Sequence, residues 1–211
     1  MYKKILAIGA HFDDIELGCG GSLAKHTKEG DDVYAYVATL SGFSNPFSKS
    51  IRKNEIAKKE GINAMKILGI KKLYTGKFET LKVEFNDELN VEILKIIEKK
   101  KIDTIYTHWH GDIHHDHKAV SKSSMHSGRH VKRILQYRSN WYHSPYDFKG
   151  NFYVNISKTW NTKKKSILAH KSEVNRTGKK WVEFFYNEAL NAGQRIGVKY
   201  AEVFDLVKYV D

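Results

Sequence analysis

Residues 5–16 read Ile-Leu-Ala-Ile-Gly-Ala-His-Phe-Asp-Asp-Ile-Glu, an apolar run that ends in a histidine and two aspartates. A short apolar run bounded by glycine is typical of a buried strand. A dinucleotide-binding turn would carry glycines at the first, third and sixth positions after this strand, where the chain has Gly9, His11 and Asp14. Two of those side chains would block the approach of a pyrophosphate. The stretch therefore predicts a strand followed by a loop of metal-ligand residues.

Apolar runs and helical patterns alternate along the first half of the chain. We expect strands at residues 33–40, 72–75 and 102–106, and helices at 21–28, 50–68 and 87–100. This alternation predicts an α/β fold that is Rossmann-like, with a mostly parallel central sheet flanked by helices. In the less regular last third, we expect strands at 134–138, 152–156 and 200–204 and helices at 159–171 and 179–192. Since no repeat or linker divides the chain, we expect a single domain over residues 1–211.

A second cluster follows the strand expected at 102–106. Residues 107–117 read Thr-His-Trp-His-Gly-Asp-Ile-His-His-Asp-His and hold five of the eleven histidines in the chain. Because ligands bind at the carboxyl ends of parallel strands, this loop and the one after residue 8 should face one crevice. His114 and His117 are three residues apart, so on a helical turn both imidazoles lie on one face. Each cluster alone has an ordinary interpretation, as a helix cap or a surface loop, but together they predict a zinc site.

The two clusters resemble the motifs of the PIG-L/LmbE-like family of zinc-dependent N-acetylglucosaminyl de-N-acetylases. The first family motif is Ala-His-Pro-Asp-Asp-x-Glu, and residues 10–16 depart from it only at Phe12. The second is Asp-x-His-x-Asp-His, which residues 112–117 match. The resemblance covers about the first 125 residues. It implies a hydrolase that removes an N-acetyl group from an amino sugar or sugar conjugate.

The resemblance also implies a role for individual residues. His11, Asp14 and His117 would bind one Zn²⁺ per chain, Asp13 would be the general base, and His114 would be the acid or electrophilic partner. The chemistry agrees, because zinc lowers the pKa of its bound water to about 7 and a nearby carboxylate can take the proton. Asp13 and Asp14 can serve different purposes because adjacent side chains diverge in an extended turn.

Several other residues near these motifs need an interpretation. We expect Asp116 to hydrogen bond His114 and fix its tautomer. Arg52 resembles the family arginine that contacts the sugar, although it could instead pair with Glu55 on the surface. We expect the stretch Gly18-Cys-Gly-Gly21 to let the backbone turn tightly into the first helix, and Cys19 to be a buried thiol. No role is assigned to His108, His110 or His115, and Trp109, Trp141, Tyr142 and Trp181 are interpreted as core residues rather than site residues.

Composition limits the remaining function classes. The chain has 211 residues, one cysteine and a net charge of +12, and residues 118–180 hold fifteen Lys/Arg against two acids. One cysteine cannot form an internal disulfide, and no apolar run reaches the length of a membrane span, so we expect a cytoplasmic protein. We expect a small-molecule partner, an N-acetyl sugar or sugar conjugate with or without a phosphate group, and no nucleic acid, and the oligomeric state stays open. The alternatives are a metal-dependent phosphoesterase and a nucleic-acid-binding module that uses the basic segment.

Overall fold

The fold is built around one mixed sheet. The computed structural model describes residues 2–211, apart from the side chain of Lys179, and within that range a seven-stranded sheet has the order β5-β2-β1-β6-β7-β9-β8. Its strands are β1 (Lys4–Gly9), β2 (Asp32–Thr39), β5 (Lys72–Phe78), β6 (Thr104–His108), β7 (Arg133–Tyr137), β8 (Phe152–Asn155) and β9 (Ala201–Tyr209). The first five are parallel neighbours, and β9 is antiparallel to both β7 and β8. The predicted α/β class with a mostly parallel sheet is confirmed.

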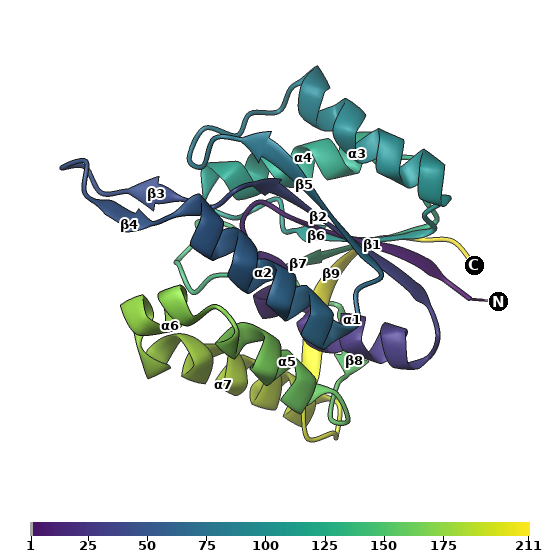
Figure 1. Ribbon diagram of the computed structural model, residues 1–211. Coiled ribbons are helices and arrows are strands. Elements are labelled where there is room, and N and C mark those ends of the chain that lie inside the picture. The colour runs from purple at the N-terminus through teal and green to yellow at the C-terminus, as the bar shows by residue number, and fades with distance from the viewer. Residues whose placement is uncertain (1) are drawn as a thin grey trace.

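Helices cover both faces of the sheet (Figure 1). They are α1 (Asp14–Lys28), α2 (Asn54–Leu68), α3 (Asp87–Lys100), α4 (His115–Ser127), α5 (Trp160–Leu168), α6 (Lys171–Thr177) and α7 (Lys179–Arg195). Helices α3 and α4 pack together on one face, while α1 and α2 lie on the other with α5 packed against them. Among the described helices, none combines the length and apolar character needed to cross a membrane.

The strand order brings the two predicted loops together. Strand β1 pairs with β2 on one side and with β6 on the other, so the chain winds outward in opposite directions from the β1–β6 junction. In a doubly wound sheet, this reversal point leaves a crevice at the carboxyl ends of the two strands. The loop after β1 carries His11, Asp13 and Asp14, and the segment after β6 leads to His114 and His117 at the start of α4.

The first helix begins earlier than predicted. Helix α1 starts at Asp14 instead of residue 21, so Gly18 lies inside the helix and does not form a turn. A Cβ at Gly18 would lie 2.0 Å from Cδ2 of Tyr137 on β7. The glycine therefore makes room for the tyrosine ring, and this close packing outweighs the low helix propensity of glycine.

No range was predicted for a small hairpin or for helices α4 and α6. Residues 50–52 belong to a small antiparallel hairpin, β3 (Phe43–Ser44) with β4 (Ser50–Arg52), and α2 begins only at Asn54. This hairpin projects from the body of the molecule in Figure 1. Helix α6 also has no apolar period of its own in the sequence, because it is short and its buried residue is Glu173.

Phe12, which replaces the family proline, is held by packing and by a hydrogen bond. The side chain is fully buried, and a Cβ on Gly61 of α2 would lie 2.2 Å from its Cδ1 atom. The backbone N–H of Phe12 donates to Oγ of Ser41 at 2.7 Å, a bond that proline cannot form. Phenylalanine thus fixes the loop through contacts with α2 and with the segment after β2.

The contact between Gly61 and Phe12 predicts the effect of a single methyl group. We expect Gly61→Ala to lower the free energy of unfolding by about 1–3 kcal/mol, because overpacking forces the ring or the helix to move. Gly20→Ala is the matched control in α1, where the nearest atom would be 3.5 Å from the new Cβ. There we expect a gain of about 0.5–1 kcal/mol from the lower entropy cost of alanine. Urea denaturation measures both changes, and an equal effect of the two would contradict the packing argument.

Candidate metal centre and catalytic cavity

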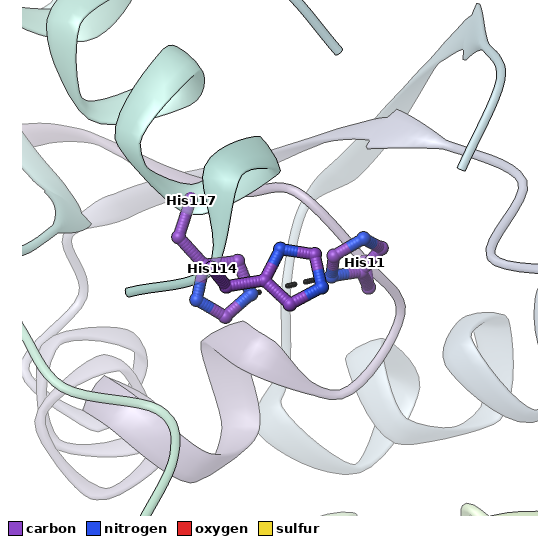
Figure 2. Close-up of side chains that lie close together, drawn as sticks. All are labelled: His11, His114 and His117. Carbon is purple, nitrogen blue, oxygen red and sulfur yellow. Dashed lines mark hydrogen bonds between the residues drawn. The ribbon is translucent and has the colours of Figure 1, made fainter. Parts of the chain in front are cut away.

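Three ligand atoms converge at the β1–β6 junction. His11 Nδ1 lies 3.3 Å from His117 Nε2 and 3.3 Å from an oxygen of Asp14. His117 Nε2 is 3.2 Å from the other oxygen of Asp14. Figure 2 shows the His11 and His117 rings facing one another, with His114 beside them. The structure therefore brings together the three residues that the sequence predicts as ligands. His11, Asp14 and His117 are called the ligand group below.

This spacing fits a zinc ion. Tetrahedral zinc ligands that lie 2.0–2.1 Å from the metal are about 3.3 Å from one another. The distances among His11, Asp14 and His117 have this value, and two imidazoles with one carboxylate form a donor set typical of catalytic zinc. His114 and His108 also lie close enough to be grouped with these residues as possible ligands.

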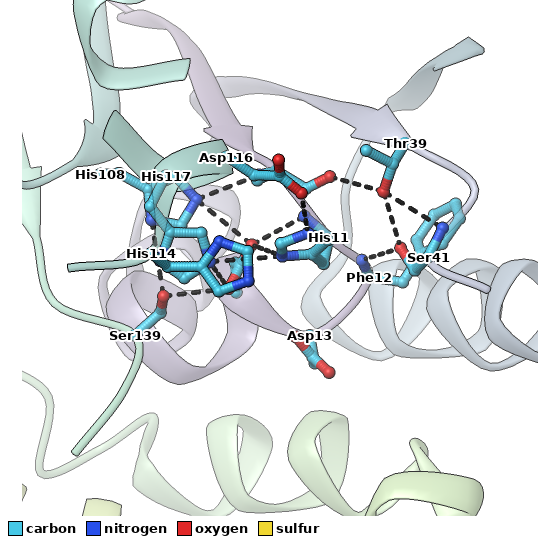
Figure 3. Close-up of polar contacts among 12 residues, drawn as sticks. His11, Phe12, Asp13, Thr39, Ser41, His108, His114, Asp116, His117 and Ser139 are labelled. Carbon is cyan, nitrogen blue, oxygen red and sulfur yellow. Dashed lines mark hydrogen bonds and ion pairs between the residues drawn. The ribbon is translucent and has the colours of Figure 1, made fainter. Parts of the chain in front are cut away.

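A carboxylate holds the outer nitrogen of each candidate histidine ligand. Asp116 accepts from Nε2 of His11 at 2.8 Å, and Asp112 accepts from Nδ1 of His117 at 3.0 Å. The side chain of Asn140 donates to Asp112 and fixes that carboxylate in turn. Such partners orient metal-binding imidazoles and set which nitrogen faces the metal. Figure 3 shows the contact between Asp116 and His11.

The expected partner of Asp116 was wrong. We expected Asp116 to hydrogen bond His114, but its carboxylate contacts His11 and accepts from the backbone N–H groups of Leu81 and Val83. The first turn of α4 directs residue 116 toward β1 and the segment after β5, whereas His114 precedes the helix as its N-cap. Sequence reasoning also assigned no role to Asp112, although its place in the second motif was a usable signal.

The neighbouring carboxylates raise the pKa values of both candidate histidine ligands. Burial lowers the pKa of His117, but Asp14 and Asp112 outweigh it and raise the pKa to about 10. Burial likewise opposes protonation of His11, and contacts with Asp116 and Asp14 raise its pKa to about 9. Both imidazoles therefore lie where the surroundings favour positive charge, which a bound cation supplies in place of protons.

Asp13 points away from the ligand group. Its backbone has a φ of +133°, a conformation that residues other than glycine rarely adopt, and its side chain makes no cap bond to α1. In Figure 3, Asp13 is turned away from the histidines, and its carboxylate lies 3.3 Å from Nη1 of Arg52. Burial raises its pKa to about 7 against the opposing effect of Arg52. Strained backbone of this kind clusters at functional sites.

Arg52 is buried. Its side chain is only 2% exposed and does not form the surface pair with Glu55 considered above. Nη1 donates to the carbonyl oxygen of Phe12 at 2.9 Å as well as to Asp13, and Nη2 contacts Glu60 at 3.2 Å. Arg52 lines the cavity, but most of its donors are used by the protein. Its expected contact with a sugar stays a prediction.

His114 lines the cavity, and one of its ring nitrogens has no hydrogen-bond partner among the described residues. Its ring stacks on His117 with centroids 4.5 Å apart, and Nδ1 is buried without a hydrogen bond among the described residues. Burial, followed by the neighbouring His117 and His11, lowers the pKa of His114 to about 4. The ring is therefore neutral at pH 7 and can donate a hydrogen bond to a substrate oxygen.

The remaining histidines of the second cluster have separate positions. His108 is buried, stacks on His117, and accepts from the backbone N–H of Ala10 at 3.0 Å. His110 contacts Gln136, and the exposed His115 contacts Asp116. Since Nε2 of His108 already accepts a backbone hydrogen bond, we interpret His108 as support for His117 and not as a ligand.

A cavity of about 270 Å³ opens over the site. Its walls include the ligand residues, Asp13, His114 and an aromatic rim formed by Phe43, Trp141, Tyr142 and Trp181. The interpretation as core residues was therefore wrong for Trp141 and Tyr142, which are exposed on the loop after β7. It was correct for Trp181 on α7, which packs in a buried apolar cluster and also lines the cavity. Trp109 and Cys19 are buried as expected. No periodicity could reveal the rim, because it comes from three distant segments.

Comparison with known proteins identifies the family of this chain. The family model described as PIG-L, GlcNAc-PI de-N-acetylase, matches residues 6–127. The chain belongs to this family. The match includes both motifs and ends near the limit of about residue 125 expected from the sequence.

Relatives extend the comparison beyond that segment. The uncharacterized deacetylase YaiS of Escherichia coli K12 is 37% identical over 147 residues, which cover 66% of this chain and 76% of that protein. Diacetylchitobiose deacetylase of Thermococcus kodakarensis is 26% identical over 223 residues, covering 95% and 81%. The conserved protein TT1542 of Thermus thermophilus has a TM-score of 0.84 at 24% identity, covers 99% and 96%, and so shares the fold.

The strained backbone at Asp13 predicts an inverted order of stability between two variants. Asp13→Gly and Asp13→Asn both remove the carboxylate, but only glycine adopts a φ of +133° without strain. We expect the glycine variant to exceed the asparagine variant by about 1 kcal/mol in free energy of unfolding. At an ordinary N-cap, glycine gives a less stable protein than asparagine. Urea denaturation measures the free energy of unfolding of both variants, and a more stable asparagine variant would rule out the strain.

The contact between Asp112 and His117 predicts a change in metal affinity. We expect Asp112→Asn to weaken zinc binding about 10–100-fold, because the imidazole loses the negative charge that orients it. Asp147→Asn removes the same charge from an exposed position on the loop after β7 and should leave affinity unchanged. Competition with a chromophoric chelator measures both, and equal affinities would show that Asp112 does not support the ligand.

Proposed function

We propose that this protein is a zinc-dependent hydrolase that removes an N-acetyl group from an amino sugar or sugar conjugate. The observation that carries the proposal is the convergence of His11, Asp14 and His117 at one edge of a cavity that Asp13 and His114 also line. Membership of a family described by de-N-acetylation supports the same reaction. We propose one zinc per chain, held by these three residues.

Each residue of the cavity has a distinct task in this proposal. His11, Asp14 and His117 would hold the zinc ion, which would supply Lewis acidity toward water and the amide carbonyl. Asp13 takes a proton from the attacking water, because its carboxylate lines the cavity beside Arg52, whereas the carboxylate of Asp14 contacts His11 and His117. His114 stabilises the developing negative charge on the carbonyl oxygen by hydrogen bonding. Asp116 and Asp112 keep the ligand imidazoles oriented.

The lining of the cavity supports a carbohydrate substrate. Aromatic side chains such as Trp141 and Tyr142 offer flat faces to a sugar ring, and both are partly exposed. The two arginines that line the cavity, Arg52 and Arg176, already pair with carboxylates, which favours a neutral ring over a phosphorylated one. Diacetylchitobiose deacetylases among the relatives are consistent with such a substrate.

The two alternative functions have less support. A two-metal phosphoesterase needs additional carboxylate ligands, but Asp112 and Asp116 are used to hold His117 and His11. The basic segment 118–180 is partly neutralised, because Lys163 pairs with Glu202 and Arg133 with Asp103. A nucleic-acid-binding module would also leave the ligand group without a purpose.

Elemental analysis of the purified protein, together with acetate release from N-acetylamino sugars before and after chelation, tests the proposed function. We expect about one zinc per chain and activity that chelation abolishes. Asp13→Asn should keep zinc and lose most turnover, whereas His117→Ala should lose both. Zinc retained by His117→Ala would overturn the ligand assignment, and zinc lost from Asp13→Asn would overturn the base assignment. No acetate from any sugar after zinc is restored would refute the reaction itself.

A further inference from the structure

A chain of buried polar contacts leads from Asp13 into the last third of the protein. Arg52 Nη1 contacts Asp13, and Nη2 of the same guanidinium lies 3.2 Å from Nδ1 of His170. His170 Nε2 lies 2.7 Å from an oxygen of Glu16. His170 and Glu16 are fully buried, and His170 lies between α5 and α6, outside the segment that the family model matches.

The partners of His170 determine which of its nitrogens carries the proton. A guanidinium can only donate, so Nδ1 of His170 must accept the hydrogen bond from Arg52. Nε2 therefore carries a hydrogen and donates it to the carboxylate of Glu16. Glu16 thus holds the imidazole in the tautomer that can accept from Arg52. Glu16 is the last residue of the first motif, for which the sequence suggested no purpose.

This tautomer matters because Arg52 holds the strained loop. Nη1 of Arg52 contacts both the carbonyl oxygen of Phe12 and the carboxylate of Asp13. Nη2 is fixed from the other side by His170 and Glu60. A planar guanidinium cannot move one nitrogen without moving the other. The position of His170 therefore restricts where the carboxylate of Asp13 can lie.

We propose that His170 is a positioning residue that, through Arg52, places the carboxylate of Asp13 for proton removal. This inference rests on the proposed function, in which Asp13 is the general base. His170 does not itself line the cavity, and the residue through which it contacts the cavity wall is Arg52. Its two nitrogens have separable tasks: Nδ1 acts on Arg52, and Nε2 anchors the ring to Glu16.

Two substitutions separate these tasks. Asparagine places an amide oxygen near the position of Nδ1, so His170→Asn keeps an acceptor for Arg52 and loses the bond to Glu16. Glutamine places an amide N–H near the position of Nε2, so His170→Gln keeps the bond to Glu16 and loses the acceptor. Each variant loses one of two buried hydrogen bonds, and we expect similar losses of thermal stability in the two.

Steady-state kinetics of the zinc-loaded variants give the first test. We expect His170→Gln to lower kcat about 100-fold, because a displacement of about 1 Å has an effect of that order, with KM and zinc content unchanged. We expect His170→Asn to keep kcat within about threefold of the wild-type value, the effect of a small residual misplacement. Equal losses of kcat in the two variants, or a loss confined to KM, would overturn the positioning role.

Crystal structures of the same zinc-loaded variants test the inference without turnover. We expect the contact between Asp13 and Arg52 to persist in His170→Asn and to break in His170→Gln. An unchanged contact in both variants would overturn the inference even if kcat fell. Failure of the wild-type protein to release acetate would refute the proposed function, and the crystallographic comparison would still decide whether His170 positions Asp13.

Discussion

The contacts of Asp14 connect the two halves of this site. One oxygen of its carboxylate lies 3.2 Å from His117 and accepts from Ser139, while the other lies 3.2 Å from His108. Asp14 is also the first residue of α1, so one side chain joins the end of β1, the start of a helix and three segments from the other half of the sheet. The pKa of Asp14 is held well below its usual value although burial opposes this, because His117 stabilises the negative charge. The candidate ligand atoms of His11 and His117 therefore converge on the carboxylate of Asp14.

The loop that carries Asp13 is strained and is held by packing and by polar contacts together. Phe12 fills the space beside Gly61 and donates its N–H to Ser41, while Arg52 binds the carbonyl oxygen of the same residue. Together, these contacts allow a residue other than glycine to keep a φ of +133°. A stiff proline would fix the loop through its own ring. In this chain, contacts from α2 and from the segment after β2 have that role.

The last third of the chain completes the cavity. Trp141 and Tyr142 come from the loop after β7, Glu173 and Arg176 from α6, and Trp181 from α7. These segments also bring the buried His170 and Glu173 toward Arg52, with Glu173 3.8 Å from its Nε atom. The segment matched by the family model thus supplies the ligand group and the candidate base, whereas the region beyond it forms much of the wall that a substrate would meet. Substrate preference is therefore expected to depend on this region.

The sequence by itself determined the alternation of strands and helices, the two motifs, and the fact that both motifs follow parallel strands. Those features were readable because periodicity, helix signals and ligand-type residues are local in the chain. Only the tertiary structure decided that Asp116 holds His11 instead of His114, that Arg52 is buried, and that three of the aromatic residues line the cavity. The early start of α1 was hidden as well, because the space that Gly18 leaves is filled by Tyr137 from a strand more than a hundred residues away. Contacts between residues distant in the chain depend on how the elements pack, and a single sequence carries no local record of that packing.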